Sequence, residues 1–312
     1  MTDANPLTLS ETRGPSEPPL RDLTIGGLLR EVAAEVPDRC AVVAGVADPG
    51  ERSEWTYADL LAEAERAARA LRVRFEPGER VALWAPNMPQ WVVLEFACGM
   101  AGVILVTINP AYQARELQYV LNQSRAAGLV LLPEFRGNPM LGTAVDVQPE
   151  CPELREIIRL DDWEDFLASG DVWDGELVDP DPRDPCMIQY TSGTTGFPKG
   201  ALLHHRGLVN NGAHTGDRVG VTEGTVYVLT MPLFHTGGCV LGVLTAVSMK
   251  MTMVLVEAFD PGLVLELIEA YHGAAMLGVP TMLLAMLEHP DFATRDLSAI
   301  DAICSGGSTV PA

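Results

Sequence analysis

The chain of 312 residues is poor in basic side chains, in aromatic residues and in long apolar runs. Its 21 Lys and Arg residues stand against 42 Asp and Glu residues, which gives a formal net charge of −21. A surface of this sign repels nucleic acid, so the composition argues against a nucleic-acid partner. The longest apolar runs, 96–108 and 239–249, fall short of the roughly 20 residues that cross a bilayer. The composition does not decide whether the protein contacts a membrane surface or whether it forms a homodimer.

The chain also lacks paired cysteines and a secretory leader. No two cysteines have the CxxC spacing or the spacing of a zinc site, which predicts reduced, mostly buried thiols in a cytoplasmic protein. Residues 1–22 are polar, contain proline and hold no apolar core of a signal peptide, so we expect a loose tail. The six cysteines are Cys40, Cys98, Cys151, Cys186, Cys239 and Cys304.

From residue 23 onward, strand-like and helix-like segments alternate. Alternation of this kind predicts βαβ units and an α/β fold with mainly parallel sheets covered by helices. Residues 179–185 hold three prolines in seven positions, which favours a linker. We therefore expect a tail over 1–22, a first α/β subdomain over 23–178 and a second over 179–312. The expected strands are 40–46, 80–84, 104–108, 129–132, 187–190, 226–229, 252–256, 275–278 and 302–305.

The most informative stretch is residues 190–200, YTSGTTGFPKG, which holds three glycines, four Ser or Thr residues and Lys199. Glycines allow successive backbone N–H groups to face an anion, and a lysine supplies a mobile positive charge. The stretch is no Walker A motif, because Pro198 precedes the lysine and Gly200 follows it. This pattern predicts a polyphosphate cradle, most simply for ATP, and disfavours a phosphate-loop kinase.

The same stretch, continued to Ala201, resembles the signature of the adenylate-forming superfamily of acyl-CoA synthetases, luciferases and peptide-synthetase adenylation domains. Blocks at 79–87, 231–238 and 305–308 are similar to further blocks of that family, in the same order. The resemblance runs from about Leu23 to the last residue. It implies two mainly parallel sheets covered by helices, as part of the large N-terminal domain of an adenylate-forming enzyme.

The resemblance implies a two-step reaction with ATP, Mg²⁺ and coenzyme A. A carboxylate attacks the α-phosphorus of ATP, which releases pyrophosphate, and a thiol then displaces AMP from the acyl-adenylate. Lys199 is expected to act in catalysis by neutralising phosphate charge, and Thr191 to bind Mg²⁺. The expected phosphate ligands are Thr191, Ser192, Gly193, Thr194, Thr195 and Gly196. The adenine pocket is expected to begin at Gly306, Gly307 and Ser308.

His235 is the second expected catalytic residue, because the resemblance places it beside the reacting carboxylate and the α-phosphate. An imidazole there can donate to an oxyanion or gate the acyl tunnel; a purely structural histidine is the alternative. His204 and His205 are expected at the surface or as helix caps. The expected substrate-binding residues are His235, Thr236, Gly237, Gly238 and Cys239.

The charges of the residues around His235 limit which class of carboxylic acid the site is expected to take. A buried ammonium group needs a carboxylate partner, and peptide-synthetase domains place an aspartate where His235 stands here. No acidic residue occurs from Met231 to Met249, and small apolar residues fill the run. This favours a fatty acid. Residues 109–112, NPAY, are also similar to the short- and medium-chain fatty acyl-CoA synthetase branch, whereas an aryl-CoA ligase stays open.

Members of the family are usually much longer. The resemblance puts the Mg²⁺-binding glutamate, the ribose-binding aspartate and the C-terminal domain with its lysine beyond Ala312. We therefore expect an N-terminal part of a fatty acyl-CoA synthetase that makes little acyl-CoA by itself. The alternative is a fragment that binds nucleotide or acyl group without turnover.

Overall fold

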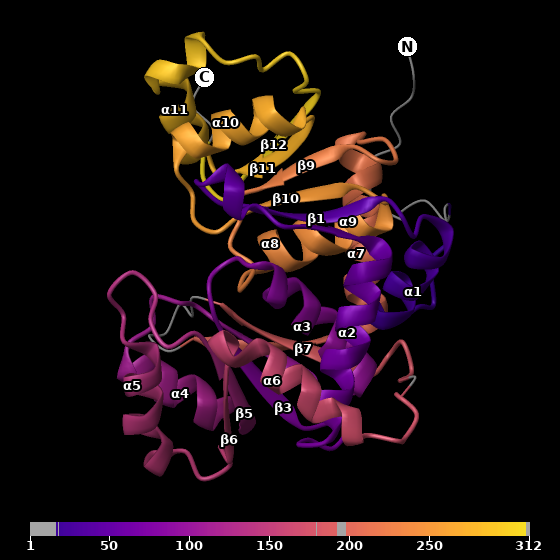
Figure 1. The fold of residues 1–312 in the computed structure, drawn as a ribbon, viewed down its shortest axis with the longest axis vertical. Coiled ribbons are helices and arrows are strands. Elements are labelled where there is room, and N and C mark those ends of the chain that lie inside the picture. Colours follow the sequence, from indigo (N-terminus) through magenta and orange to yellow (C-terminus); the bar gives the residue numbers. More distant parts are fainter. Residues whose placement is uncertain (1–16, 18, 179, 192–197, 310–312) are drawn as a thin grey trace, which may run out of the picture.

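The structure, a computed structural model, describes residue 17 and residues 19–178, 180–191 and 198–309. The expected phosphate ligands Ser192, Gly193, Thr194, Thr195 and Gly196 lie outside the described residues. Two six-stranded sheets form separate layers, one above the other in Figure 1. Helices lie between the two sheets and on their outer faces, which confirms the expected α/β class.

The upper sheet has the strand order β12-β11-β9-β10-β1-β2, and the lower sheet β6-β5-β3-β4-β7-β8. Neighbouring strands are parallel except for the edge pairs β1–β2 and β7–β8. The strands of the upper sheet are β1 (Cys40–Gly45), β2 (Glu54–Thr56), β9 (Val226–Leu229), β10 (Thr252–Val256), β11 (Ala275–Gly278) and β12 (Ala302–Ser305). Those of the lower sheet are β3 (Arg80–Trp84), β4 (Ile104–Ile108), β5 (Ala126–Leu131), β6 (Glu156–Arg159), β7 (Pro185–Thr191) and β8 (Lys199–His204).

The helices begin at recognisable sequence signals. Thr56 and Asp59 form a capping box at the start of α2, and prolines occupy the first turns of α3, α10 and α11. The α-helices are α1 (Ile25–Glu35), α2 (Tyr57–Arg72), α3 (Pro89–Ala101), α4 (Ala114–Ser124), α5 (Met140–Val147), α6 (Trp163–Ala168), α7 (His205–Val219), α8 (Thr236–Gly238), α9 (Thr245–Ser248), α10 (Pro261–Tyr271) and α11 (Pro280–Leu287). A π-helical segment, η5 (Cys239–Leu244), connects α8 to α9.

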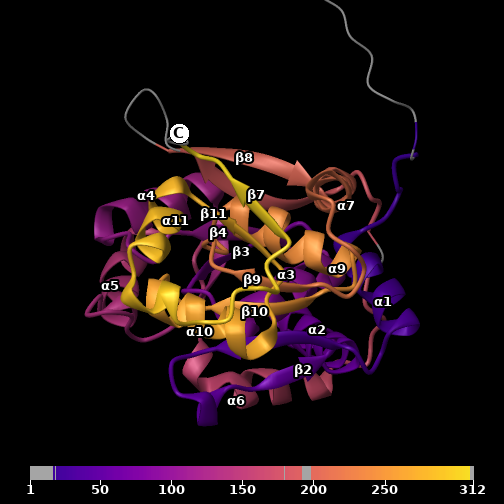
Figure 2. The ribbon, with the colours of Figure 1, turned by 90° about the horizontal axis from the view of Figure 1, so that it is seen from above.

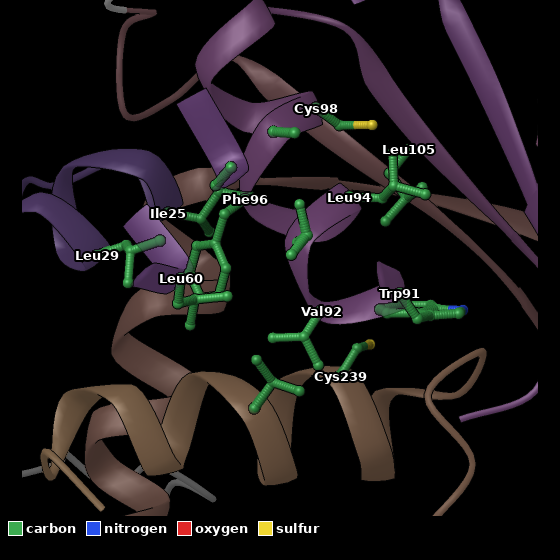
Figure 3. Close-up of a cluster of buried hydrophobic side chains, with 14 of the residues drawn as sticks. Ile25, Leu29, Leu60, Trp91, Val92, Leu94, Phe96, Cys98, Leu105 and Cys239 are labelled. Atoms are coloured by element: carbon green, nitrogen blue, oxygen red, sulfur yellow. The ribbon is translucent and has the colours of Figure 1, made fainter. Parts of the chain in front are cut away.

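Alternating residues of each strand face different cores. In β3, Val81 and Leu83 belong to the large central core between the sheets, whereas Ala82 and Trp84 belong to the core under α4 and α5. In β10, Met253 faces the central core and its neighbours face α10. A parallel sheet buried on both faces requires such continuous apolar strands. The central core, part of which Figure 3 shows, therefore joins the two sheets into one packed body.

The two sheets exchange chain segments. Strand β1 pairs with β10 in the upper sheet and β2 pairs with β1, although both strands come from the first half of the chain. Strands β7 and β8 belong to the lower sheet, although they follow residue 179. Each sheet therefore contains strands from both sides of the expected division between residues 178 and 179. The division of the chain into two subdomains at that point stays a prediction.

The expected strands are confirmed, and six of them, β3, β4, β9, β10, β11 and β12, have the expected bounds. Strands β2, β6 and β8 and helices α5 and α6 were missed, because their segments carry no clear sequence signal. The apolar run 239–249 does not form one regular α-helix, because Cys239–Leu244 is π-helical and Thr245–Ser248 is α-helical. Pro185 was expected in a linker but starts β7, a position where a strand tolerates proline.

Within the part of the chain that the structure describes, no helix combines the length and the apolar character that crossing a membrane requires. The six cysteines are free, four of them buried and two partly exposed, as expected.

Candidate active site

The expected phosphate-binding stretch, residues 190–200, begins in β7 and ends in β8, the two strands of an antiparallel hairpin. Thr191, the last residue of β7, pairs in register with Lys199, the first residue of β8. Both residues are exposed, and the Thr191 hydroxyl donates to the Lys199 carbonyl oxygen over 3.4 Å. The hairpin thus brings the expected Mg²⁺ ligand and the expected catalytic lysine side by side at one edge of the lower sheet (Figure 2).

A second loop leaves the carboxyl end of β9 and carries His235. Side chains from β4 and from the loop that follows β3 hold this loop. Asn87 donates to the carbonyl oxygens of Met231 and Val256, both over 3.0 Å, and accepts from the Leu233 backbone over 2.8 Å. The Thr107 hydroxyl, in β4, donates to the Phe234 carbonyl over 2.7 Å. These bonds fix the backbone immediately before His235.

His235 is an exposed N-cap residue of α8. Its Nδ1 accepts a hydrogen bond from the Gly237 backbone N–H over 2.9 Å. Because Nδ1 is used as an acceptor, the neutral imidazole carries its proton on Nε2. Nε2–H is then the group that a ligand oxygen can use, and the cap fixes the side chain that presents it.

The three residues Gly237, Gly238 and Cys239 are buried, and the structure gives them packing roles. A Cβ on Gly238 would lie 2.2 Å from the Pro232 carbonyl oxygen, so the tight turn needs glycine there. The Cys239 thiol lies against Gln189 of β7, whose Nε2 is 3.1 Å from Sγ. This contact ties the start of the π-helix to β7, two residues before Thr191.

The expected adenine-binding turn follows the last strand, β12. A Cβ on Gly306 would meet nothing within 4 Å, so the space beside this glycine is open. Gly307 has a φ of +87°, a left-handed conformation that glycine adopts without strain. Gly307 and Ser308 are exposed. Open space at the carboxyl end of a parallel strand is where α/β sheets bind ligands.

A cavity of about 480 Å³ lies between the carboxyl ends of both sheets. Its walls are mostly apolar, with Arg136 and Glu257 as the charged side chains, which is typical of a small-molecule site. The Asn138 amide donates to the carbonyl oxygens of Pro110 and Tyr112, and its buried Oδ1 has no hydrogen-bond partner among the described residues. The apolar lining includes Pro86, Pro110, Phe135, Pro232, Phe234 and Phe259.

A second, narrow cavity of about 30 Å³ lies between the upper sheet and the π-helix. Tyr227, Leu241, Met276 and Leu277 are among its lining residues. The Tyr227 hydroxyl donates to the Leu241 carbonyl over 3.4 Å and so connects strand and π-helix. In this conformation, the cavity has room for about one small group.

Buried titratable side chains lie behind the site. Glu95 of α3 is completely buried, and neither carboxylate oxygen has a hydrogen-bond partner among the described residues. Burial therefore raises the pKa of Glu95 well above its ordinary value. Burial, with Glu95 nearby, also raises the pKa of Cys98, Cys186 and Cys239, so these thiols stay protonated. They have the character of structural rather than nucleophilic cysteines.

The two histidines after the hairpin have different positions. His204 caps α7, with Nδ1 accepting from the Gly207 backbone over 2.9 Å, as expected. His205 is 1% exposed and accepts from the Ile25 backbone, so the expected surface or capping position is wrong. Its imidazole joins α1 to α7 in the central core.

Sequence reasoning missed Asn87, Thr107 and Gln189, which hold the loop and the π-helix. Asn87 belongs to the block at 79–87 and directly precedes Met88, the N-cap residue of α3. Thr107 and Gln189 are polar residues within otherwise apolar strands, and each is less than 5% exposed. A polar residue in a buried strand was the available signal, since it needs a partner.

Three comparisons with known proteins agree with this arrangement. The family model described as "AMP-binding enzyme" matches residues 29–312. "Putative acyl-CoA synthetase YngI" of Bacillus subtilis is 36% identical over 92% of this chain and 57% of its own length. Human "Medium-chain acyl-CoA ligase ACSF2, mitochondrial" is 32% identical over 97% of this chain and 54% of its own length.

Among solved structures, the N-terminal domain of FACL13 from Mycobacterium tuberculosis superposes with a TM-score of 0.80 and 27% identity, over 93% of this chain and 71% of that one. The chain spans a little more than half the length of the two relatives compared by sequence. Because the family model covers most of the sequence and both sheets recur in the solved domain, this chain belongs to the AMP-binding enzyme family.

Proposed function

We propose that the whole protein activates a fatty acid with ATP to an acyl-adenylate and then transfers the acyl group to coenzyme A. The observation that carries the proposal is the set of cross-sheet contacts at the strand ends. Thr107 binds the carbonyl just before His235, and Gln189 contacts Cys239 just after it. These contacts hold the His235 loop against the strand that leads to Thr191.

ATP and Mg²⁺ fit the hairpin end. Thr191 and Lys199 are both exposed, so a hydroxyl oxygen and an ammonium group are available to a polyphosphate. Among the described residues, no group of three His, Cys, Asp or Glu side chains could form a metal site. A single hydroxyl suits Mg²⁺, which commonly keeps water and substrate phosphates as its other ligands. When bound, the ion supplies charge neutralisation for the attack of one anion on another.

The chain's own groups then have defined tasks. Lys199 binds phosphate charge, which matters most when that charge is rearranged during the reaction. His235 presents Nε2–H, held by its Nδ1 cap, to an oxygen of the carboxylate or the α-phosphate. Gly306 leaves room for the purine at the end of β12.

The cavity of about 480 Å³ fits the pantetheine arm of coenzyme A. An arm with two amide groups suits apolar walls with few polar atoms, and the buried Asn138 Oδ1 offers an acceptor to an amide N–H. Arg136 supplies a cation at the wall for a phosphate group. Phe234 lines this cavity and directly precedes His235, so the thiol arrives beside the reacting carbon.

The acyl tail is assigned to the space between the upper sheet and the π-helix. All six residues of η5 are apolar or glycine, and no carboxylate there could pair with an ammonium group. A tail longer than a methyl group requires the cavity of about 30 Å³ to widen. A π-helical segment is a common place for such adjustment at functional sites. An aryl acid is the second candidate, and the same apolar walls favour it.

Pyrophosphate exchange by the whole protein tests the proposal. Fatty acids of increasing length, aryl acids and amino acids are compared at equal concentration, with and without Mg²⁺. We expect exchange with fatty acids and subsequent acyl-CoA formation when coenzyme A is added. Exchange with amino acids alone would contradict the fatty-acid assignment, and exchange with aryl acids alone would favour the second candidate. The reduced thiols favour a cytoplasmic location, which fractionation of cells tests.

A further inference from the structure

Helix α4 touches both strands of the hairpin that carries Thr191 and Lys199. The Tyr119 hydroxyl donates to the Pro198 carbonyl over 3.0 Å, at the residue before Lys199. On the other strand, the Tyr190 hydroxyl donates to the Val120 carbonyl over 3.3 Å and also contacts the Gln123 side chain. Two consecutive residues of α4 therefore hold the two sides of one hairpin.

Strand β8 needs such support because it forms the edge of the lower sheet. Among the residues that the structure describes, only β7 pairs with it, and the registered ladder starts at Lys199. Pro198 has no N–H to donate, so the described contact of its backbone is the carbonyl bond from Tyr119. An edge strand with pairing on one side is free to move at its end unless another element holds it.

Helix α4 is itself packed against the lower sheet, so it can hold the hairpin in place. Leu117, Val120 and Leu121 of α4 are buried in the outer core of the lower sheet. Ser124 donates to the Val120 carbonyl, and Arg125 closes the helix in a left-handed conformation. Gly200 of β8 also packs closely against this helix, since a Cβ on Gly200 would lie 3.2 Å from the Gln123 Oε1 atom.

We propose that Tyr119 is a positioning residue, which fixes the Pro198 carbonyl and thereby the direction in which Lys199 leaves β8. The proposal rests on the proposed function, because it concerns the lysine assigned to phosphate. Loss of the hydroxyl leaves the Lys199 charge in place but lets it sample other directions. Misdirected charge costs transition-state stabilisation more than ground-state binding.

The test compares Tyr119→Phe with Tyr57→Phe in the whole protein. Both changes remove one hydroxyl that donates to a backbone carbonyl; that of Tyr57 is completely buried and bonds Met251 over 2.7 Å. For Tyr119→Phe we expect kcat of pyrophosphate exchange to fall by about 2- to 12-fold, the range that one net hydrogen bond represents. The KM for the fatty acid should stay unchanged. Tyr57→Phe should lower the melting temperature and leave kcat unchanged.

A second readout does not depend on turnover. Acetic anhydride labels Lys199, and mass spectrometry measures how far Mg-ATP protects it. Protection should be strong in the unchanged protein and in Tyr57→Phe, and at least twofold weaker in Tyr119→Phe. Equal protection and equal kcat in all three proteins would overturn the role of Tyr119. A different result would separate the two proposals. If Mg-ATP protects Lys199 less in Tyr119→Phe than in the unchanged protein, but no acid supports pyrophosphate exchange, the proposed function is overturned and the positioning role of Tyr119 is supported.

Discussion

The buried carboxyl of Glu95 makes a quantitative prediction about stability. Its folded-state pKa is raised by burial, and no described group offers it a hydrogen bond. In the unfolded chain, the carboxyl loses its proton near its ordinary pKa of about 4.3. Between that value and the raised pKa, the folded state binds one more proton than the unfolded state. Stability is therefore greatest below the unfolded pKa and is lost as the pH rises toward the folded pKa.

The magnitude follows from proton linkage. One extra proton in the folded state lowers the free energy of unfolding by about 1.36 kcal/mol per pH unit. Stability is lost at this rate over the pH range in which the folded carboxyl keeps its proton and the unfolded one does not. Glu95→Gln removes the titrating carboxyl, so it should also remove this pH-dependent part of the free energy of unfolding. Glu95→Met also removes the unsatisfied polar atoms and should stabilise the fold by about 1–3 kcal/mol at pH 7.5.

Urea unfolding followed by tryptophan fluorescence at pH 5.5, 6.5 and 7.5 measures this component. For each protein, the free energy of unfolding is plotted against pH. The difference between the slopes of the unchanged chain and Glu95→Gln isolates the Glu95 titration, since all other titrations are common to both. Glu164→Gln is the control, because that side chain is 77% exposed. Identical pH dependence of the unchanged chain and Glu95→Gln would refute the reasoning.

Three further predictions concern the site. Lys199→Ala should lower kcat/KM for ATP in the whole protein by about 10²-fold or more with little effect on folding; unchanged kcat/KM in a folded variant would contradict the role. His235→Asn keeps an N-cap and His235→Ala loses it, so unfolding should differ by about 1 kcal/mol whereas adenylation falls in both; retained adenylation in either variant would remove the catalytic role. Gly238→Ala places a Cβ against the Pro232 carbonyl and should lower the free energy of unfolding in urea by about 3 kcal/mol. Gly306→Ala should change that free energy by no more than about 0.5 kcal/mol. The same variant should weaken ATP binding, which calorimetry measures. Equal stability of the two glycine variants, or normal ATP affinity of Gly306→Ala, would count against these assignments.

The elements that the sequence predicted well are those whose pattern is local. Strands such as β10 and β4 are short apolar runs between turn signals, and α10 begins with Asp260 and proline, a cap and first-turn pair. Strand β8 was missed because its residues are mostly exposed and its start follows proline. An edge strand has no apolar face to reveal it, since only pairing with β7 defines it.

The candidate site was partly predictable for the same reason. The block that carries His235 stands out by its sequence, and its apolar continuation into η5 was visible. The cross-sheet bonds of Asn87 and Thr107 were not, because both partners lie more than 120 residues away along the chain. Nor could the sequence show that Gly238 serves a close backbone contact while Gly306 faces open space.

By itself, the sequence determined the fold class, the family and the order of the motifs, because apolar periodicity, turn residues and the glycine-rich stretch are local features. Only the tertiary structure decided which strands share a sheet, since β1 from the start of the chain pairs with the distant β10, and β2 joins the sheet through β1. It also decided which side chains hold the hairpin and the His235 loop. Sheet pairing and cross-sheet hydrogen bonds depend on how distant segments pack, and a single segment carries no record of its partner in its own pattern.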